Sequence, residues 1–252
     1  MHIKSPKEIQ IMRSGGKKLH SIRERLLQEI NPGVVPLAID ELTKKLISVA
    51  GGSPSFMTVG DYKWATCIST NDGVVHGVPT DEPFQEGDVV GLDVGLLYQG
   101  FHTDTSWTKI VQSSQLEVDS KTKNFVKTGE KALKKAISQA KFGNRIGHIS
   151  CAIQDTIESA GFSVVASLVG HGVGKRLHES PQVPGLLTKP LKKTPELEIG
   201  MVLAIEVIYC LGKPELVYKN DDHWSLVTAD GSLSGLFEQT VQISENGPII
   251  LT

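Results

Sequence analysis

Apolar positions in the first 50 residues recur at helical spacing. Ser5, Pro6 and Glu8 form a helix start, since Ser can cap, Pro suits the first helical position and Glu closes a capping box. The apolar face that follows comprises Ile9, Met12, Leu19, Ile22, Leu26 and Ile30. "NPG" at 31–33 ends this helix, and a second is predicted over 36–50. Its inward face is expected to comprise Ile39, Leu42, Leu46 and Val49.

Strand-like text and two further helices fill the rest of the chain. Strands are expected at 66–69, 74–76, 88–97, 101–111, 163–169, 201–210, 214–219, 224–229 and 236–243. Helices are expected from Asp119 to Ala140 and from Ile146 to Ala160, the latter ended by Gly161. This order, two helices and then strands, occurs twice and indicates a mixed α/β (α+β) protein.

A weak internal repeat accompanies that order. "VVHGVP" at 74–79 resembles "VGHGVG" at 169–174, and "EGDVVGLDVG" at 86–95 resembles "EIGMVLAIEV" at 198–207. The period is too long for a solenoid. We therefore predict one domain over 1–252, built from two related halves at roughly 1–115 and 116–252.

Two aspartates lie in the strand-like text "GLDVGLLYQGFHTDTSW" at 91–107. If this is a hairpin with a two-residue turn at 99–100, Asp93 lies opposite Ser106. The same register places Gly95 opposite Asp104, so the two acids become diagonal neighbours on one face, roughly 7–8 Å apart. A turn one residue longer would place them on opposite faces.

Interior carboxylates need a compensating charge. Each buried ion loses several kcal/mol of hydration and like charges repel, yet the facing segments hold no Lys or Arg before Lys109. Two more acids, Glu206 and Glu238, lie in apolar strand text. Four carboxylates would balance two divalent cations, and oxygen-rich ligation with one imidazole suits manganese, iron, cobalt or zinc. The candidate imidazoles are those of His76, His171 and His178.

Each residue also has a purely structural interpretation. A lone acid in a strand usually faces solvent, and a lone His is more often structural than a ligand. "GHGVG" lacks the spacing of a nucleotide-binding loop. Cys67 reads more simply as a buried thiol than as a nucleophile. Trp224 is either a core aromatic or a pocket wall. Because each residue alone has such an alternative, the metal hypothesis rests on the joint pattern.

Composition narrows the class of protein further. With 26 basic and 28 acidic residues in 252, no global field favours nucleic acid or a membrane. Three cysteines indicate a reduced, intracellular protein rather than a disulfide framework. The N-terminus lacks a signal-peptide run, and the longest apolar run, "MVLAI" at 201–205, is far below the roughly 20 residues of a spanning helix. We expect a soluble cytoplasmic protein.

Five motifs together resemble one known family, the type I methionine aminopeptidases. They are "CISTNDGVVHGVP", "GLDVGLLYQGFHTDTS", "GHGVGKRLHESPQVP", "GMVLAIEV" and "LFEQT", in the family's order. The resemblance covers the whole chain and implies the pita-bread fold, in which two pseudo-symmetric halves surround a dinuclear metal site. It also implies a metal-dependent hydrolase that removes N-terminal methionine by means of a metal-bridging hydroxide.

The resemblance assigns site residues. The metal ligands would be Asp93, Asp104, His171, Glu206 and Glu238, with Asp104 and Glu238 bridging two divalent ions (cobalt, manganese, iron or zinc). Asp93 would complete one metal site, and His171 and Glu206 the other. His76 and His178 would contact the substrate or the tetrahedral intermediate. In the mechanism that we expect, Glu206 or a neighbouring carboxylate would take the proton of the attacking water. The methionine pocket would be lined by Tyr62, Cys67, Leu177 and Trp224.

Three positions depart from the family pattern. The family usually has Pro where this chain has Val207, His where it has Gln239 and Phe where it has Leu177. The ligands survive these changes. They affect the surroundings of Glu206 and Glu238, where such changes can cost 10–100-fold in metal affinity or activity, and the shape of the methionine pocket.

Two rival functions remain at this stage. One is a proline-directed aminopeptidase or dipeptidase on the same fold, and the other is a non-catalytic pita-bread module that binds peptides. The expected partners are N-termini of peptides and nascent proteins, with docking on ribosomes left open. Direct binding of nucleic acid or a membrane is not expected, and family precedent implies a monomer.

Overall fold

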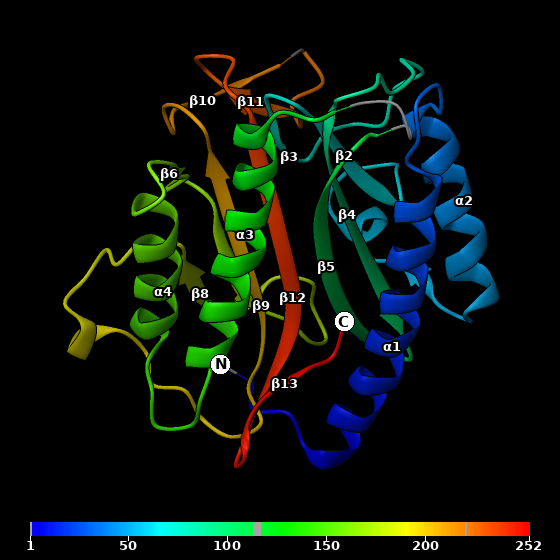
Figure 1. Ribbon diagram of the computed structural model, residues 1–252. Helices are drawn as coiled ribbons and strands as arrows, with labels where there is room; N and C mark the ends of the chain where they lie inside the picture. Colours follow the sequence, from blue (N-terminus) through cyan, green and yellow to red (C-terminus); the bar gives the residue numbers. More distant parts are fainter. Residues whose placement is uncertain (1, 113–116, 220) are drawn as a thin grey trace.

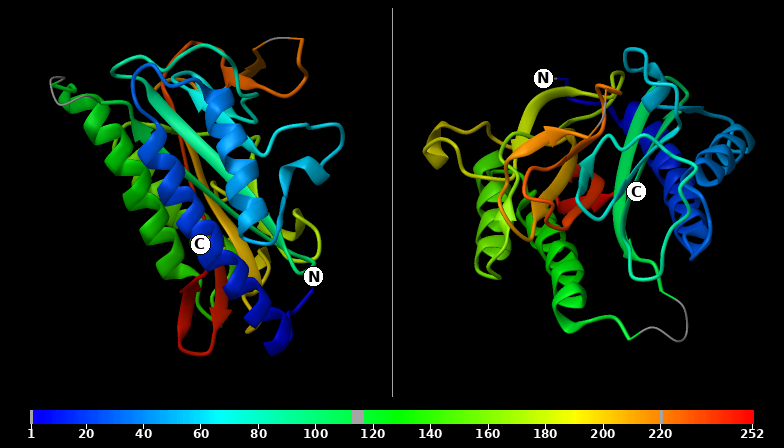
Figure 2. Two further views of the ribbon diagram at one scale, coloured as in Figure 1. Left: turned by 90° about the vertical axis from the view of Figure 1, so that its right-hand side faces the viewer. Right: turned by 90° about the horizontal axis from the view of Figure 1, so that it is seen from above.

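The computed structural model describes residues 2–112, 117–219 and 221–252. A large antiparallel sheet carries four α-helices, and α1 and α3 lie along the same face of that sheet (Figures 1 and 2). The helices are α1 (Pro6–Glu29), α2 (Pro36–Val49), α3 (Ser120–Gln139) and α4 (Ile146–Glu158), with short 3-10 turns at η1 (Phe56–Thr58) and η2 (Leu191–Lys193).

The large sheet has ten strands, and its main path runs β1-β4-β5-β12-β9-β7-β8. These strands are β1 (Ser53–Pro54), β4 (Val89–Tyr98), β5 (Phe101–Ile110), β12 (Ser234–Ser244), β9 (Val202–Cys210), β7 (Val169–Gly172) and β8 (Glu179–Pro184). Attached to this path are β2 (Thr66–Thr70), β6 (Ser163–Val164) and β13 (Gly247–Ile250). A second sheet contains β10 (Leu216–Tyr218), β11 (Leu226–Thr228) and β3 (Gly73–Val75).

The N-terminal helices form as their sequence predicts, with one error. Ser5 and Glu8 make the expected capping box of α1, and the six residues predicted for its inner face are buried. In α2 the prediction for Val49 is wrong, because its side chain is 88% exposed. Ile47 is fully buried instead, so the inner stripe of α2 is offset from the predicted one.

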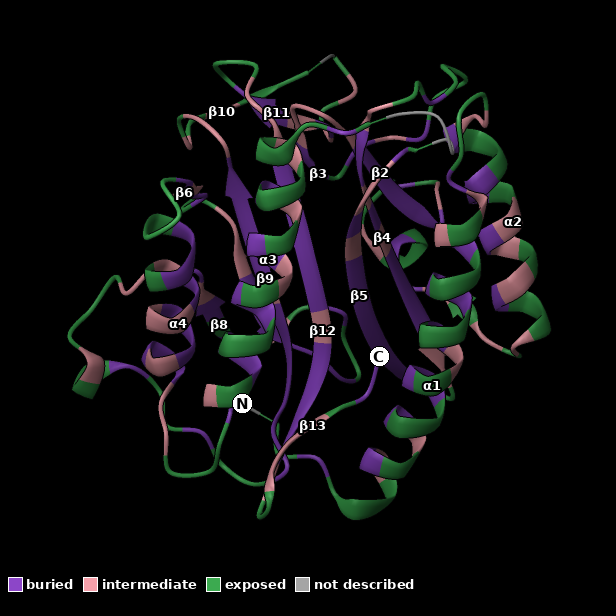
Figure 3. Ribbon diagram, in the orientation of Figure 1, coloured by how far each residue is buried: buried purple, intermediate pink, exposed green. Residues whose placement is uncertain are grey.

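Along the central strands, the core side chains and the acidic side chains point to opposite faces of the sheet. Alternate residues of β4 from 90 to 96 pack in one core with α1 and α2, and alternate residues of β9 from 203 to 209 pack with α3 and α4. Successive side chains of a strand point to opposite faces. Asp93 and Glu206 therefore project from the face that lies away from the helices, and β9 and β12 are buried along most of their length (Figure 3).

The hairpin of β4 and β5 has the register predicted from sequence. Asp93 lies opposite Ser106 and Gly95 lies opposite Asp104. The turn residues Gln99 and Gly100 both have positive φ, 49° and 82°, as a type I′ turn requires. The two aspartates consequently share a face of the sheet.

Matched backbone contacts support two related halves. Gly87 and Gly200 have φ of 92° and 90°, and each precedes a central strand. The Gly87 amide donates to Val111 at 2.7 Å, and the Gly200 amide donates to Ile243 at 3.0 Å. The single domain over 1–252 stays a prediction, and the proposed boundary at 115 and 116 lies outside the described residues. Within the described ranges, no helix has both the length and the hydropathy to cross a bilayer.

Candidate active site

A row of polar residues crosses the four central strands at one level. Asp93 in β4 is opposite Ser106 in β5, which in turn is opposite Glu238 in β12. Glu238 is opposite Glu206 in β9. Directly opposed residues share a face, with Cβ atoms about 4.5–5.5 Å apart. Three of the four residues in this row carry carboxylates. Antiparallel pairing of the strands therefore brings acids from distant sequence positions together on one face.

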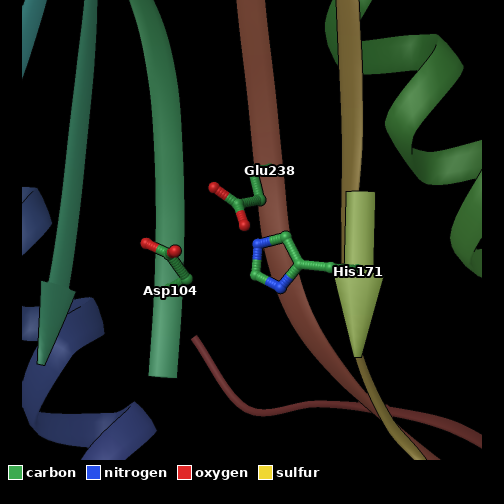
Figure 4. Close-up of side chains that lie close together, drawn as sticks. All are labelled: Asp104, His171 and Glu238. Atoms are coloured by element: carbon green, nitrogen blue, oxygen red, sulfur yellow. The ribbon is translucent and has the colours of Figure 1, made fainter. Parts of the chain in front are cut away.

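Two more predicted residues join this row from the same face. Asp104 is two positions from Ser106 in β5, and His171 in β7 is opposite Ala204, two positions from Glu206. An interval of two residues preserves the face of a strand. One ligand atom each from Asp104, His171 and Glu238 lies within 4.8 Å of the others, and Figure 4 shows the three side chains converging.

Burial raises the pKa values of these carboxyl groups. Asp104 and Glu238 are only 4% and 2% exposed. Burial raises the pKa of Asp104 to about 7. Burial, and then repulsion from Asp104, raise the pKa of both Glu206 and Glu238 well above the usual range. The pKa of Asp93 is also raised, by burial and by the charges of Asp104 and Glu206.

Buried carboxylate oxygens without a hydrogen-bond partner indicate that the acid cluster needs a bound cation to neutralise it. Among the described residues, Asp93 Oδ1 and Glu238 Oε1 are buried without a hydrogen-bond partner. His171 Nδ1 lies 2.9 Å from the Gly172 carbonyl, which favours a proton on Nδ1 and a lone pair on Nε2. That Nε2 lies 3.4 Å from Glu206 Oε1. Electron-rich atoms facing one another across so short a distance fit divalent cations, so the donor set suits a metal centre.

A cavity of about 150 Å³ opens directly onto these acids. All of the predicted site residues line it, namely Tyr62, Cys67, His76, Asp93, Asp104, His171, Leu177, His178, Glu206, Trp224 and Glu238. Sequence reasoning missed four apolar lining residues, Phe56, Val59, Val75 and Leu236. Phe56 and Val59 lie in and just after η1, between predicted elements, where apolar periodicity gives no signal.

One end of the cavity is an apolar pocket. Phe56, Tyr62, Cys67 and Leu177 form a buried cluster against which Trp224 packs. The rings of Tyr62 and Trp224 meet edge to face at 5.1 Å, and the Tyr62 hydroxyl donates to the Thr66 carbonyl at 2.9 Å. Burial raises the pKa of the Cys67 thiol well above its usual value, so it remains a neutral wall residue.

Two histidines flank the acids. His76 follows β3 with φ of 55°, a conformation that non-glycine residues rarely adopt, and its ring lies 6.5 Å from that of Trp224. His178 is exposed, with its ring 4.5 Å from that of His171. Both residues keep contact with solvent, yet the protein around their rings partly desolvates them, which lowers the pKa of both His76 and His178 and keeps them neutral at pH 7.

The structure shows the contacts of the three residues that depart from the family pattern. Val207 is fully buried on the helix side of β9, one residue from Glu206. Gln239 Nε2 donates to the Thr252 carbonyl at 2.6 Å and so ties β12 to the C-terminus. Leu177 is 5% exposed and contributes to the wall of the apolar pocket.

Comparisons with known proteins agree with this geometry. Residues 10–246 match the model of metallopeptidase family M24. Methionine aminopeptidase 1 of Bacillus subtilis is 37% identical over 99% of this chain and 98% of its own length. The methionine aminopeptidase of Clostridium perfringens is 38% identical with the same coverage. The crystal structure of methionine aminopeptidase from Thermotoga maritima superposes with a TM-score of 0.95 at 40% identity, covering 100% of this chain and 99% of that one.

The fold and the acid cluster define a metal-dependent hydrolase with the pita-bread architecture. More specifically, the chain belongs to metallopeptidase family M24. Both expectations from the sequence, the fold class and the family, are confirmed.

Proposed function

We propose that this protein is an aminopeptidase that hydrolyses the bond after an N-terminal methionine in peptides and proteins. The observation that carries the proposal is the convergence of the buried acids and His171 on one cavity with an apolar end. Relatives that span the chain from end to end are named methionine aminopeptidases, which supports the same reaction. The apolar cluster at the cavity offers contacts to an apolar N-terminal side chain.

Five side chains are proposed to hold two divalent metal ions, with cobalt, manganese, iron or zinc as the candidates. They are Asp93, Asp104, His171, Glu206 and Glu238, and two ions of charge +2 would balance four carboxylates. Bound divalent ions lower the pKa of water from about 15.7 toward about 7 and polarise a carbonyl. The raised pKa values and unpaired oxygens of the cluster support this assignment.

The remaining steps are assigned to groups of the chain itself. Glu206, part of the acid row, accepts the proton of the attacking water. His178 and His76, neutral and beside the cavity, donate hydrogen bonds to the substrate carbonyl as its oxygen gains charge. Tyr62, Cys67, Leu177 and Trp224 hold the methionine side chain and exclude water from it.

Two alternatives considered from the sequence are less well supported. A proline-directed peptidase would share the fold, but the relatives matched over the full chain are named for methionine. A non-catalytic binding module has no need for a cluster of unpaired buried acids, whose retention costs stability.

The cellular setting is also a proposal. Three free cysteines suit a reducing compartment, so we place the enzyme in the cytoplasm. There it would act as a monomer on the N-termini of peptides and nascent chains, and docking on ribosomes is the partnership to test.

Replacing one proposed ligand tests the function directly. Asp104→Ala removes a carboxylate at the centre of the cluster, and we expect turnover of a Met-Ala-Ser peptide with added manganese or cobalt to fall by about 100-fold or more. Asp155→Ala, at an exposed position of α4, is the matched control and should retain activity. Undiminished turnover by Asp104→Ala would refute the metal assignment.

A further inference from the structure

A second hollow adjoins the active-site cavity. It has a volume of about 350 Å³, and its polar lining comprises His171, Arg176, His178, Glu179, Ser180 and Gln182. His171 and His178 also line the central cavity. The hollow, which we name the Arg176 groove, therefore continues from the histidine side of the reaction site.

Arg176 is the charge in this groove that lacks a partner. Its side chain is exposed, and no acid in the described part of the chain lies within ion-pair distance of its guanidinium. Glu179, the acid that lines the groove, is already paired with Lys4 Nζ at 2.9 Å, and these two side chains are 8% and 2% exposed. The neighbouring Lys175 faces Glu8 at 3.6 Å. The groove is left with one uncompensated positive charge.

Backbone hydrogen bonds hold Arg176 in place. The Gly174 amide donates to the Arg176 carbonyl at 3.1 Å, and the Arg176 amide donates to Glu179 Oε1 at 3.1 Å. The Gly174 carbonyl in turn accepts from the His102 amide at 2.7 Å, which anchors the loop to β5. A guanidinium on a fixed backbone can favour an anion without first ordering a loop.

We propose that the Arg176 groove is a subsite for the substrate residues downstream of the cleaved bond, and that Arg176 makes it select acidic ones. This inference rests on the proposed aminopeptidase function. An extended peptide advances about 3.3 Å per residue, so the third and fourth residues lie about 7–10 Å beyond the reacting carbonyl. A carboxylate there can pair with the guanidinium, while Ser180 and Gln182 offer neutral hydrogen-bonding groups to the peptide backbone.

Matched peptides measure this preference. The experiment compares kcat/KM for Met-Ala-Ser-Ser with versions carrying Asp or Lys at position three or four, using the metal-loaded full chain. We expect the Asp peptide to be favoured over the Lys peptide by about two- to fivefold at one of these positions, the range of an exposed ion pair. The preference should weaken in about 1 M salt, where the Debye length is about 3 Å.

Variants assign the preference to one residue. Arg176→Met should bring the Asp-to-Lys ratio close to one and Arg176→Glu should invert it, and a ratio is insensitive to any general loss of activity. Lys175→Met removes an adjacent exposed charge outside the groove and should leave the ratio unchanged. Equal rates for Asp and Lys peptides at both positions, or a ratio that survives Arg176→Met, would overturn the proposal. If Met-Ala-Ser itself is not cleaved, the proposed function fails and the subsite with it.

Discussion

Leu177 shows how one side chain can set selectivity. It is 5% exposed, packs beside Phe56, Tyr62 and Cys67, and stands where the family usually has phenylalanine. A leucine at this position leaves more room in a cavity of about 150 Å³ than a phenyl ring would. The pocket should consequently discriminate less well between methionine and other apolar N-terminal residues.

Leu177→Phe should therefore sharpen selectivity. The added ring narrows the pocket, which an unbranched thioether tolerates better than a branched side chain does. We expect the ratio of kcat/KM for Met-Ala-Ser over Leu-Ala-Ser to rise about tenfold. A change of this size is typical of the discrimination between substrates that differ by one methylene group in an apolar pocket. Leu177→Met, which conserves volume, is the control. A ratio that is unchanged or lower in Leu177→Phe would count against Leu177 as a pocket wall.

At this scale the sequence predicts part of the site on physical grounds alone. Asp93 and Asp104 share a hairpin, so a local turn rule brings them together. Glu206 and Glu238 can be recognised only as acids in apolar text, because their pairing depends on β12 lying between β5 and β9. The sequence therefore included that pair in the metal hypothesis, while the family resemblance assigned each acid its role as a ligand. Phe56, in its short 3-10 turn, was predicted by neither.

Among the elements, α3 makes an unusually close approach to the sheet. A Cβ atom on Gly129 would lie 2.5 Å from the Tyr209 hydroxyl and 2.6 Å from the Phe237 ring. Both aromatic residues are fully buried, and the Tyr209 hydroxyl donates to the Phe125 carbonyl at 2.7 Å. Neither ring can move aside, so the glycine sets the distance between α3 and the two central strands.

Gly129→Ala should destabilise the protein despite the better helix propensity of alanine. Propensity favours alanine by about 1 kcal/mol, whereas overpacking a rigid core costs about 1–3 kcal/mol and should outweigh it. Urea unfolding of the metal-loaded protein would measure the net loss of stability. Lys127→Ala, at an exposed position of the same helix, should stay within about 0.5 kcal/mol of the parent protein. A net gain in Gly129→Ala would show that α3 packs less tightly than described.

The four helices and the long strands were predictable because their apolar periods and caps are local. Several short strands, such as β2 and β3, were also predicted, whereas β8 was not. Its sequence, "ESPQVP", contains two prolines, which normally argue against a strand. It lies at the end of the sheet order, and among the described strands its partner is β7, so it occupies an edge position that tolerates proline. The predicted strand at 163–169 was too long, since β6 ends at Val164.

On the scale of the whole molecule, the two predicted halves of the chain meet at the row of buried acids. β5 and β12 pair with each other at Ser106 and Glu238, and the acid row extends from there into β4 and β9. In the described part of the chain, the α-helices pack against the opposite face, so the acids lie outside both hydrophobic cores. The central claim is that this arrangement is stable at neutral pH because divalent cations bind between the halves.

The most direct test is the pH dependence of stability with and without metal. An acid whose folded pKa is raised binds more protons in the native state, so stability falls as pH rises through that pKa. For Asp104 the shift is from 3.8 to about 7. Thermal unfolding of the metal-free protein between about pH 5.5 and about pH 8.5 should show stability falling with pH, and manganese or cobalt should abolish the fall. A metal-free protein whose stability stays constant or rises over this range, or one that metal leaves unchanged, would contradict the account.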